Sequence, residues 1–166
     1  MELMNYKERA GINKKSFELN YNGGTIWCEH LDSMGNMETE VINKFKEDYK
    51  TFSSPSVSSY MIINLDETIV SDRITECIVN GITECSKRFM KIAFVGVGKK
   101  EQKQFERIEK ESGVIVSYFK DYEKAKEWTL EEKSTWYLEK QIKTIIHTYI
   151  DFYQIIMSVE LILIGT

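Results

Sequence analysis

Alternation of apolar and polar residues near the start of the chain predicts a hairpin. Residues 16–20 alternate weakly, and in residues 25–31 (TIWCEHL) successive side chains fall on opposite sides of an extended strand. Asn22, Gly23 and Gly24 lie between the two segments. These residue types adopt the positive φ angles of a tight turn at little cost, so we expect two antiparallel strands joined there.

Further along the chain, apolar runs alternate with segments of helical spacing. The runs predict buried strands at residues 60–65 (YMIINL), 91–97 (KIAFVGV) and 114–119. Apolar residues three and four apart predict helices at residues 36–50, 72–90, 102–111 and 121–129. Such alternation implies right-handed crossovers and a mainly parallel sheet. The predicted fold class is therefore α/β, with a four- to five-stranded mixed sheet and helices packed on it.

Residues 131–166 differ in character from the rest of the chain. Polar residues at steps of 4, 3, 4, 3 and 4 form one stripe along a predicted amphipathic helix: Lys140, Thr144, His147, Asp151, Gln154 and Ser158. Most residues between them are apolar, but Lys143, Asp151 and Glu160 make the segment too polar for a clean membrane span. The helix is expected to pack on its own domain or on a second subunit, giving a homodimer, or to lie at a membrane surface.

Composition narrows the class of protein. The chain of 166 residues is 42% hydrophobic, enough for a core in one domain, which we place at residues 14–130, with a C-terminal helical extension at 131–166. A net charge of −4 argues against general nucleic-acid binding, because that affinity depends on neutralising phosphates. Three cysteines with no C-x-x-C pair and no secretory signal predict a cytoplasmic protein.

Four short motifs follow one another within residues 16–130. They are Glu29-His30-Leu31-Asp32 before a predicted helix, Ile62-Ile63-Asn64-Leu65 in a predicted strand, RIEKESGV at 107–114 and FKDYEKAKEW at 119–128. In this order they resemble the STAS domain of anti-sigma-factor antagonists. The resemblance implies a non-enzymatic protein-interaction and regulatory module without a cofactor. The implied partner is a kinase-like anti-sigma factor or another signalling component.

The resemblance places the partner-binding loop before the second predicted helix of the domain. Its residues are Thr68, Ser71, Asp72, Arg73, Ile74 and Thr75. In the antagonists this loop reads D-S-S-G, and phosphorylation of the second serine breaks the partner complex. Here Asp72 matches the aspartate, but Ile74 takes the place of that serine and Thr75 takes the place of the glycine. The resemblance therefore extends to the fold and not to the phosphoswitch.

Other candidate sites have simpler structural interpretations. A basic face formed by Lys99, Lys103, Arg107 and Lys110 could bind an anion, but the acidic residues beside it favour local ion pairs. Cys28 and His30 share one strand face, with no further ligands spaced for zinc. Residues 96–100 (GVGKK) lack the first glycine and the hydroxyl residue of a phosphate loop. We expect Ser71 or Asp72 to cap the helix that follows.

The sequence predicts no catalytic residue and no metal site. Two alternatives from other classes stay open. One is a membrane-associated or lipid-handling STAS-like module that uses the C-terminal helix. The other is an enzyme whose site has no recognisable motif.

Overall fold

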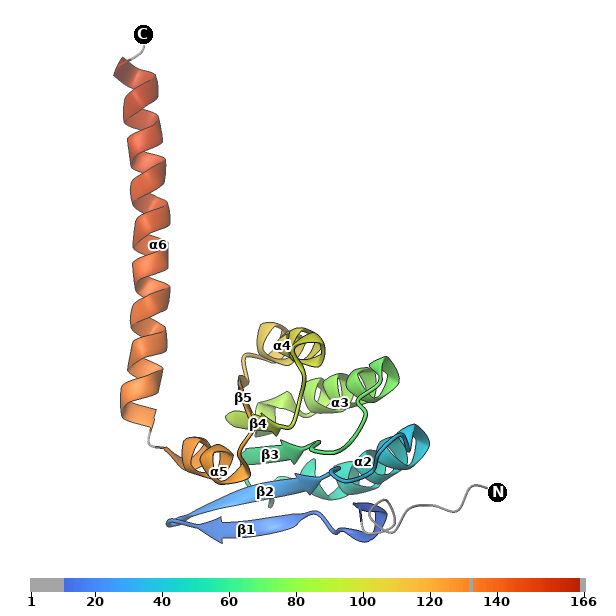
Figure 1. Ribbon diagram of the computed structural model, residues 1–166. Helices are drawn as coiled ribbons and strands as arrows, with labels where there is room; N and C mark the ends of the chain where they lie inside the picture. The colour runs from blue at the N-terminus through green and yellow to red at the C-terminus, as the bar shows by residue number, and fades with distance from the viewer. Residues whose placement is uncertain (1–10, 132, 165–166) are drawn as a thin grey trace. The chain divides into compact units, whose positions relative to one another are not determined.

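The computed structural model describes residues 11–131 and 133–164 (Figure 1). Contacts divide the chain into two compact units that meet between Leu130 and Glu131. The first unit is an α/β domain. In the second unit the structure shows a single long helix, α6, which runs from Lys133 to Ile164.

A five-stranded mixed sheet forms the centre of the domain. The strands are β1 Phe17–Tyr21, β2 Gly24–His30, β3 Tyr60–Asn64, β4 Lys91–Val95 and β5 Ile115–Phe119, and they lie side by side in chain order. β1 pairs antiparallel with β2, and every other neighbouring pair is parallel. The predicted fold class and the mutual parallel arrangement of the last three strands are confirmed.

The hairpin turn follows from its sequence. Asn22 and Gly23 both have positive φ angles, 43° and 80°, and Tyr21 pairs with Gly24 across the turn. Two consecutive residues with positive φ give a turn whose twist matches that of the flanking strands, and Asn-Gly is the favoured pair for it.

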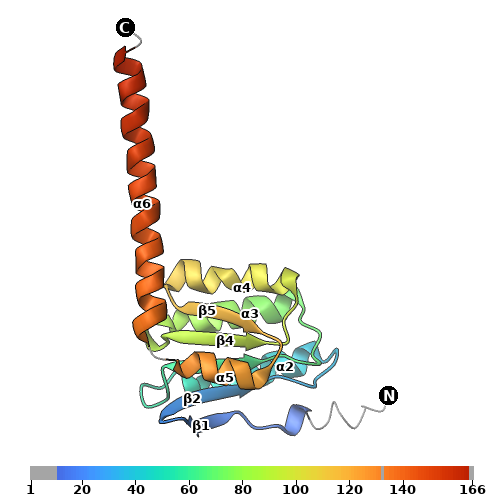
Figure 2. The same cartoon turned by 60° about the vertical axis from the view of Figure 1, so that its left-hand side comes forward.

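Helices cover both faces of the sheet (Figure 2). One face carries α2 Glu38–Phe52, α3 Asp72–Glu84 and α4 Lys99–Ser112, and the other carries α5 Tyr122–Leu130. The larger core lies on the three-helix side and includes Phe45, Ile63, Ile78, Phe94 and Phe105. The smaller core, beneath α5, includes Ile26, Cys28, Ile62, Val95 and Ala125. Side chains at odd and even positions of β2 thus enter different cores, as the alternation predicts.

Several predicted boundaries differ from the structure, including the start of α4, which lies at Lys99 rather than at residue 102. The helix expected over 72–90 ends at Glu84, and a short 3₁₀ turn, η1 Ser86–Arg88, follows. Phe89 is 6% exposed and packs against Phe52, so the apolar spacing in the sequence continues past the end of the helix because this residue is still part of the core. The strand expected over 91–97 ends at Val95, because Gly96 turns the chain with a φ angle of 76°.

Candidate protein-docking site

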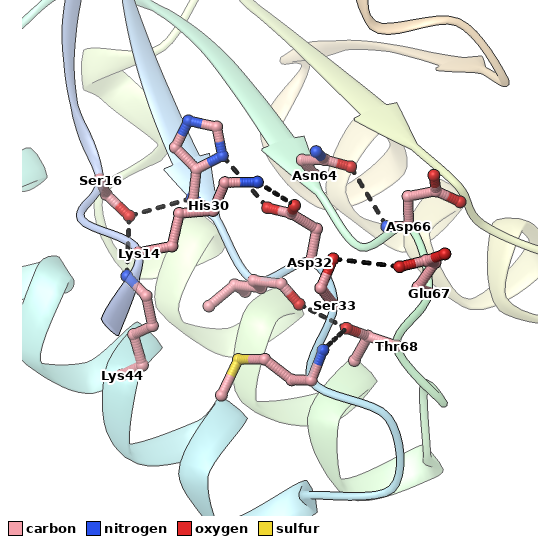
Figure 3. Close-up of polar contacts among 12 residues, drawn as sticks. Lys14, Ser16, His30, Asp32, Ser33, Lys44, Asn64, Asp66, Glu67 and Thr68 are labelled. Atoms are coloured by element: carbon pink, nitrogen blue, oxygen red, sulfur yellow. Dashed lines mark hydrogen bonds and ion pairs between the residues drawn. The ribbon is translucent and has the colours of Figure 1, made fainter. Parts of the chain in front are cut away.

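Two loops pair with each other beyond the carboxyl ends of β2 and β3 (Figure 3). We call residues 31–37 the β2–α2 loop and residues 65–71 the β3–α3 loop. Thr68 joins them, because its hydroxyl donates to the Leu31 carbonyl oxygen at 2.6 Å and accepts from the Met34 amide at 3.1 Å. This one side chain therefore satisfies two backbone groups of the neighbouring loop.

Backbone hydrogen bonds extend the pairing of these two loops. The Ser33 amide donates to the Asp66 carbonyl at 2.8 Å, and the Gly35 amide donates to the Glu67 carbonyl at 3.0 Å. In return, the Ile69 amide donates to the Gly35 carbonyl at 2.7 Å. The β3–α3 loop thus has a fixed shape, which lowers the entropy that a partner would have to remove on binding.

Backbone conformation supports the same conclusion. Ser33 and Glu67 have φ angles of 59° and 53°. This left-handed conformation costs a non-glycine residue about 1–2 kcal/mol. The Ser33 hydroxyl donates to Glu67 Oε2 at 3.3 Å, which connects the two residues directly. Such conformations persist where surrounding contacts determine the backbone, and here the paired loops provide those contacts.

The β3–α3 loop exposes one large apolar side chain to solvent. Ile69 is 67% exposed, whereas its neighbour Val70 packs against the larger core. Ile69 could not be singled out from the sequence, because nothing in residues 68–71 distinguishes the isoleucine that faces outward from the valine that faces inward.

The start of α3 separates the six predicted loop residues into accessible and buried groups. Ser71 is the cap, since its hydroxyl accepts from the Ile74 amide at 3.2 Å. Ile74 is 1% exposed and Thr75 is fully buried, with its hydroxyl donated to the Ser71 carbonyl at 3.1 Å. A partner at this surface can therefore reach Thr68, Ser71, Asp72 and Arg73, but not Ile74 or Thr75.

Asp72 and Arg73 connect α3 to the helices on either side. Asp72 Oδ1 accepts from Gln104 Nε2 at 3.0 Å and from Lys100 Nζ at 3.1 Å, both on α4. These two interactions, that of Gln104 first, lower the pKa of the Asp72 carboxyl. Arg73 pairs with Glu38 of α2 at 2.6 Å. The beginning of α3 is thereby positioned between its two neighbours.

A groove of about 580 Å³ runs between α2 and α3 and begins beside Asp72 and Arg73. Its apolar lining comes from both helices, and it consists of Ile42, Phe45, Tyr49, Cys77 and Gly81. The two helices approach closely at Gly81, where an added Cβ atom would lie 2.8 Å from a ring carbon of Phe45. Charged side chains border this apolar lining, including Lys46, Glu76 and Glu84.

The predicted basic face lies on α4 and is partly occupied by internal ion pairs. Arg107 contacts Glu76 of α3 at 2.6 Å and Glu111 at 3.2 Å, and Lys110 lies 3.6 Å from Glu106. The predicted local ion pairs are thus present for two of the four basic residues. Lys99 and Lys103 are exposed on the same helix.

Cys28 and His30 lie on the α5 side of the sheet. His30 Nδ1 is 3.1 Å from Asp32 Oδ1, and the ring stacks between Phe17 and Tyr122 at centroid distances of 5.6 and 6.0 Å. His30 therefore has a hydrogen-bond partner within the domain. Burial raises the pKa of the Cys28 thiol, which is fully inaccessible.

Glu29, on the opposite face of β2, is a fully buried carboxyl group. Trp27 Nε1 donates to its Oε2 atom at 2.8 Å, whereas Oε1 has no hydrogen-bond partner among the described residues. Burial, followed by the negative charge of Asp48, raises the pKa of Glu29 to about 8, and Trp27 and Lys44 oppose that rise. This property could not be predicted from the sequence, because it depends on how α2 covers the strand.

Ser16 and Lys44 contact each other in the way that a serine–lysine pair does. Ser16 Oγ accepts from Lys44 Nζ at 3.1 Å and from the His30 amide at 3.0 Å (Figure 3). The same hydroxyl donates its proton to Asp48 Oδ2 at 2.8 Å, and Lys44 also donates to that oxygen. Because Lys44 donates to both Ser16 Oγ and Asp48 Oδ2, this network connects the entry of β1 to α2.

Comparison with known proteins adds no relative to this description. We find no protein family whose profile matches the chain, and no curated protein or solved structure that is similar to it. Across the described residues 11–131 and 133–164, no three histidine, cysteine or acidic side chains are placed to hold a metal ion.

Proposed function

We propose that this protein is a non-enzymatic docking module whose β3–α3 loop and α2–α3 groove bind a partner protein. The observation that carries the proposal is the combination of a rigid loop with an exposed apolar tip. Ile69 projects from a loop fixed by Thr68 and by the β2–α2 loop, and the chain continues directly into Asp72 and Arg73 at the groove. An apolar anchor on a preorganised backbone is a common basis of protein recognition.

The resemblance to STAS domains supports the same surface. In that resemblance, this loop and the helix that it begins contact the partner, which is a kinase-like anti-sigma factor or another signalling component. The charges around the groove are mixed in sign, with Lys46 and Arg73 near Glu76 and Glu84. Such a border favours a protein with both acidic and basic side chains over a polyanion.

We further propose that the partner complex is constitutive rather than switched by phosphate. Ile74 has no hydroxyl group and lies in the core. Thr75 is inaccessible in the folded domain, and Ser71 uses its oxygen to cap α3. Intact-mass spectrometry of protein isolated from its native cells tests this proposal. A substantial population with one phosphate mapped to residues 68–75 would restore the switch.

The docking proposal is tested by affinity capture and then by a purified binding assay. The full chain, an Ile69→Glu variant and a Ser56→Glu control are used as baits in extract of the source cells, and captured proteins are identified by mass spectrometry. Ser56 is exposed in the loop between α2 and β3, so the control adds the same charge elsewhere. We expect one partner to be retained by the wild type and by Ser56→Glu.

Titration of that purified partner should then show at least a tenfold weaker Kd for Ile69→Glu, since a buried apolar anchor contributes about 1–3 kcal/mol. A Kd for Ile69→Glu within twofold of the wild type would contradict the assignment of this surface. Circular dichroism and thermal melting of each bait verify that all three are equally folded.

A further inference from the structure

The exposed apolar surface of the described chain is concentrated on α6. Among the side chains whose burial the structure describes, every exposed large hydrophobic residue apart from Phe17 and Ile69 lies between Ile142 and Val159. Eleven such side chains lie in that stretch, each 41% to 70% exposed. Together they present on the order of 1,000 Å² of apolar surface, against about 300–600 Å² for the largest patch of a typical monomer.

The spacing of these residues matches a helix-pairing seam. Six of them recur at alternating steps of three and four, which are positions a and d of a heptad: Ile142, Ile145, Tyr149, Phe152, Ile156 and Val159. A seam with this repeat stays in contact with a partner helix that carries the same repeat. Ile146 and Tyr153 follow the d residues at position e and widen the apolar face.

Charge also favours a second copy of the helix as the partner. Between residues 142 and 159 the formal charges are those of Lys143 and Asp151, which cancel, so two copies do not repel each other. The polar stripe over this stretch is Thr144, His147, Asp151, Gln154 and Ser158, with no lysine or arginine. Helices that lie on membrane surfaces usually have several basic residues along the polar face, whereas the 142–159 stretch has Lys143 alone, beside the stripe.

The available area agrees with self-association. A stable interface removes about 800 Å² from each partner, and the apolar surface of α6 is large enough to supply that area. Among the described residues, none of the helices is both long and apolar enough to cross a bilayer.

We propose that the chain self-associates through α6, with the 142–159 seam packed against the same seam of a second copy. The 142–159 seam and the proposed docking surface on the α/β domain have no residues in common. Self-association through this seam gives the protein two identical docking surfaces per dimer.

The test compares the full chain with two variants that place the same new carboxylate in the middle of α6. Phe152→Asp lies on the seam, and Gln154→Asp lies on the polar stripe. Masses are measured by sedimentation velocity and light scattering from about 1 to 100 μM. We expect the wild type and Gln154→Asp to show one discrete mass of at least two chains, with dissociation constants within about threefold of each other. The dissociation constant of Phe152→Asp should be at least 100-fold higher than that of the wild type, as expected for an interface anchor.

Flotation with vesicles of phosphatidylcholine and phosphatidylglycerol distinguishes a lipid surface from a second copy of the chain as the partner of α6. A monomeric wild type at 100 μM overturns the proposal, and a monomer that floats with the vesicles assigns the apolar face to lipid instead. A polydisperse mass distribution, or a Phe152→Asp variant that associates like the wild type, also overturns it. Far-UV circular dichroism of each variant shows whether the α/β domain has kept its fold.

Discussion

Replacing Glu29 with glutamine should stabilise the domain at neutral pH, although the change only exchanges one carboxyl oxygen for an amide nitrogen. The carboxyl group of Glu29 is fully buried, and burial together with Asp48 raises its pKa to about 8. Glutamine retains an oxygen that can accept from Trp27 Nε1, and its amide group can donate toward Asp48. The substitution therefore preserves the packing while removing the proton equilibrium.

The sign and size of the effect follow from proton linkage. Below pH 4.5, the ordinary value for glutamate, Glu29 is protonated in both the folded and the unfolded chain, and it contributes no pH dependence. Between pH 4.5 and about 8 only the unfolded chain releases the proton, so the free energy of unfolding falls by about 1.4 kcal/mol per pH unit. At pH 7 the wild type has thus lost about 3 kcal/mol of stability that the glutamine variant retains.

Urea unfolding at pH 5, 6, 7 and 8, followed by tryptophan fluorescence at one protein concentration, measures this difference. The gain in stability from Glu29→Gln should increase from pH 5 to pH 8, because the contributions of all other groups cancel between the two proteins. Glu127→Gln, at an exposed position on α5, is the matched control and should show no such increase. Parallel pH profiles for wild type and Glu29→Gln would refute the reasoning, as would a variant less stable than the wild type at pH 7.

Four further substitutions test the loops around the sheet. Gly96→Ala should destabilise the domain by more than 2 kcal/mol, and Gly113→Ala by about 1 kcal/mol. Both glycines have positive φ, but only at Gly96 would the new Cβ atom clash, 2.5 Å from Asp66 Cα, so equal losses in thermal melts would contradict this reasoning. Thr68→Val should cost about 1–3 kcal/mol in urea unfolding, since it leaves two backbone groups of the paired loop unsatisfied, and a loss below 0.5 kcal/mol would argue against the pairing. For Asp32, burial acts to raise the carboxyl pKa but is outweighed by the hydrogen bond to His30 and by Lys14, so the pKa is lowered. Its stabilisation should be lost as the pH falls below about 4, and Asp32→Asn should flatten that acid limb of the stability profile.

The sheet could be predicted from the sequence because each of its elements has a local cause. Asn22 and Gly23 encode the hairpin turn, and the continuous apolar runs at β3 and β4 encode strands covered on both faces. The end of α3 could not be predicted, because Phe89 maintains the apolar spacing through a 3₁₀ turn. The local pattern of apolar residues indicates which residues are buried, but it does not indicate the backbone geometry that buries them.

The candidate site was less predictable because its properties arise between segments far apart in the chain. Resemblance pointed to Thr68, but its two bonds to the β2–α2 loop, at Leu31 and Met34, appear only when the parallel strands bring the loops together. Glu29 is part of a short motif in the sequence, and only the cover of α2 reveals it as a buried acid. Sequence therefore identified the segment, and tertiary contacts determine which of its side chains a partner can reach.

Ile74, which stands where the STAS resemblance would place a phosphorylated serine, also contributes to the rigidity of the proposed docking surface. A phosphorylatable hydroxyl must be accessible, and a loop that presents one to a kinase has to remain partly solvated. Ile74 instead packs into the larger core one turn below the cap formed by Ser71, so the start of α3 is fixed by apolar contacts. With Thr68 fixing the other end, the accessible residues between them belong to one preformed surface. On the proposed function, such a surface would bind according to shape and concentration, and pairing of two chains through α6 would raise the effective concentration for a partner that presents two binding sites, without any change in the loop.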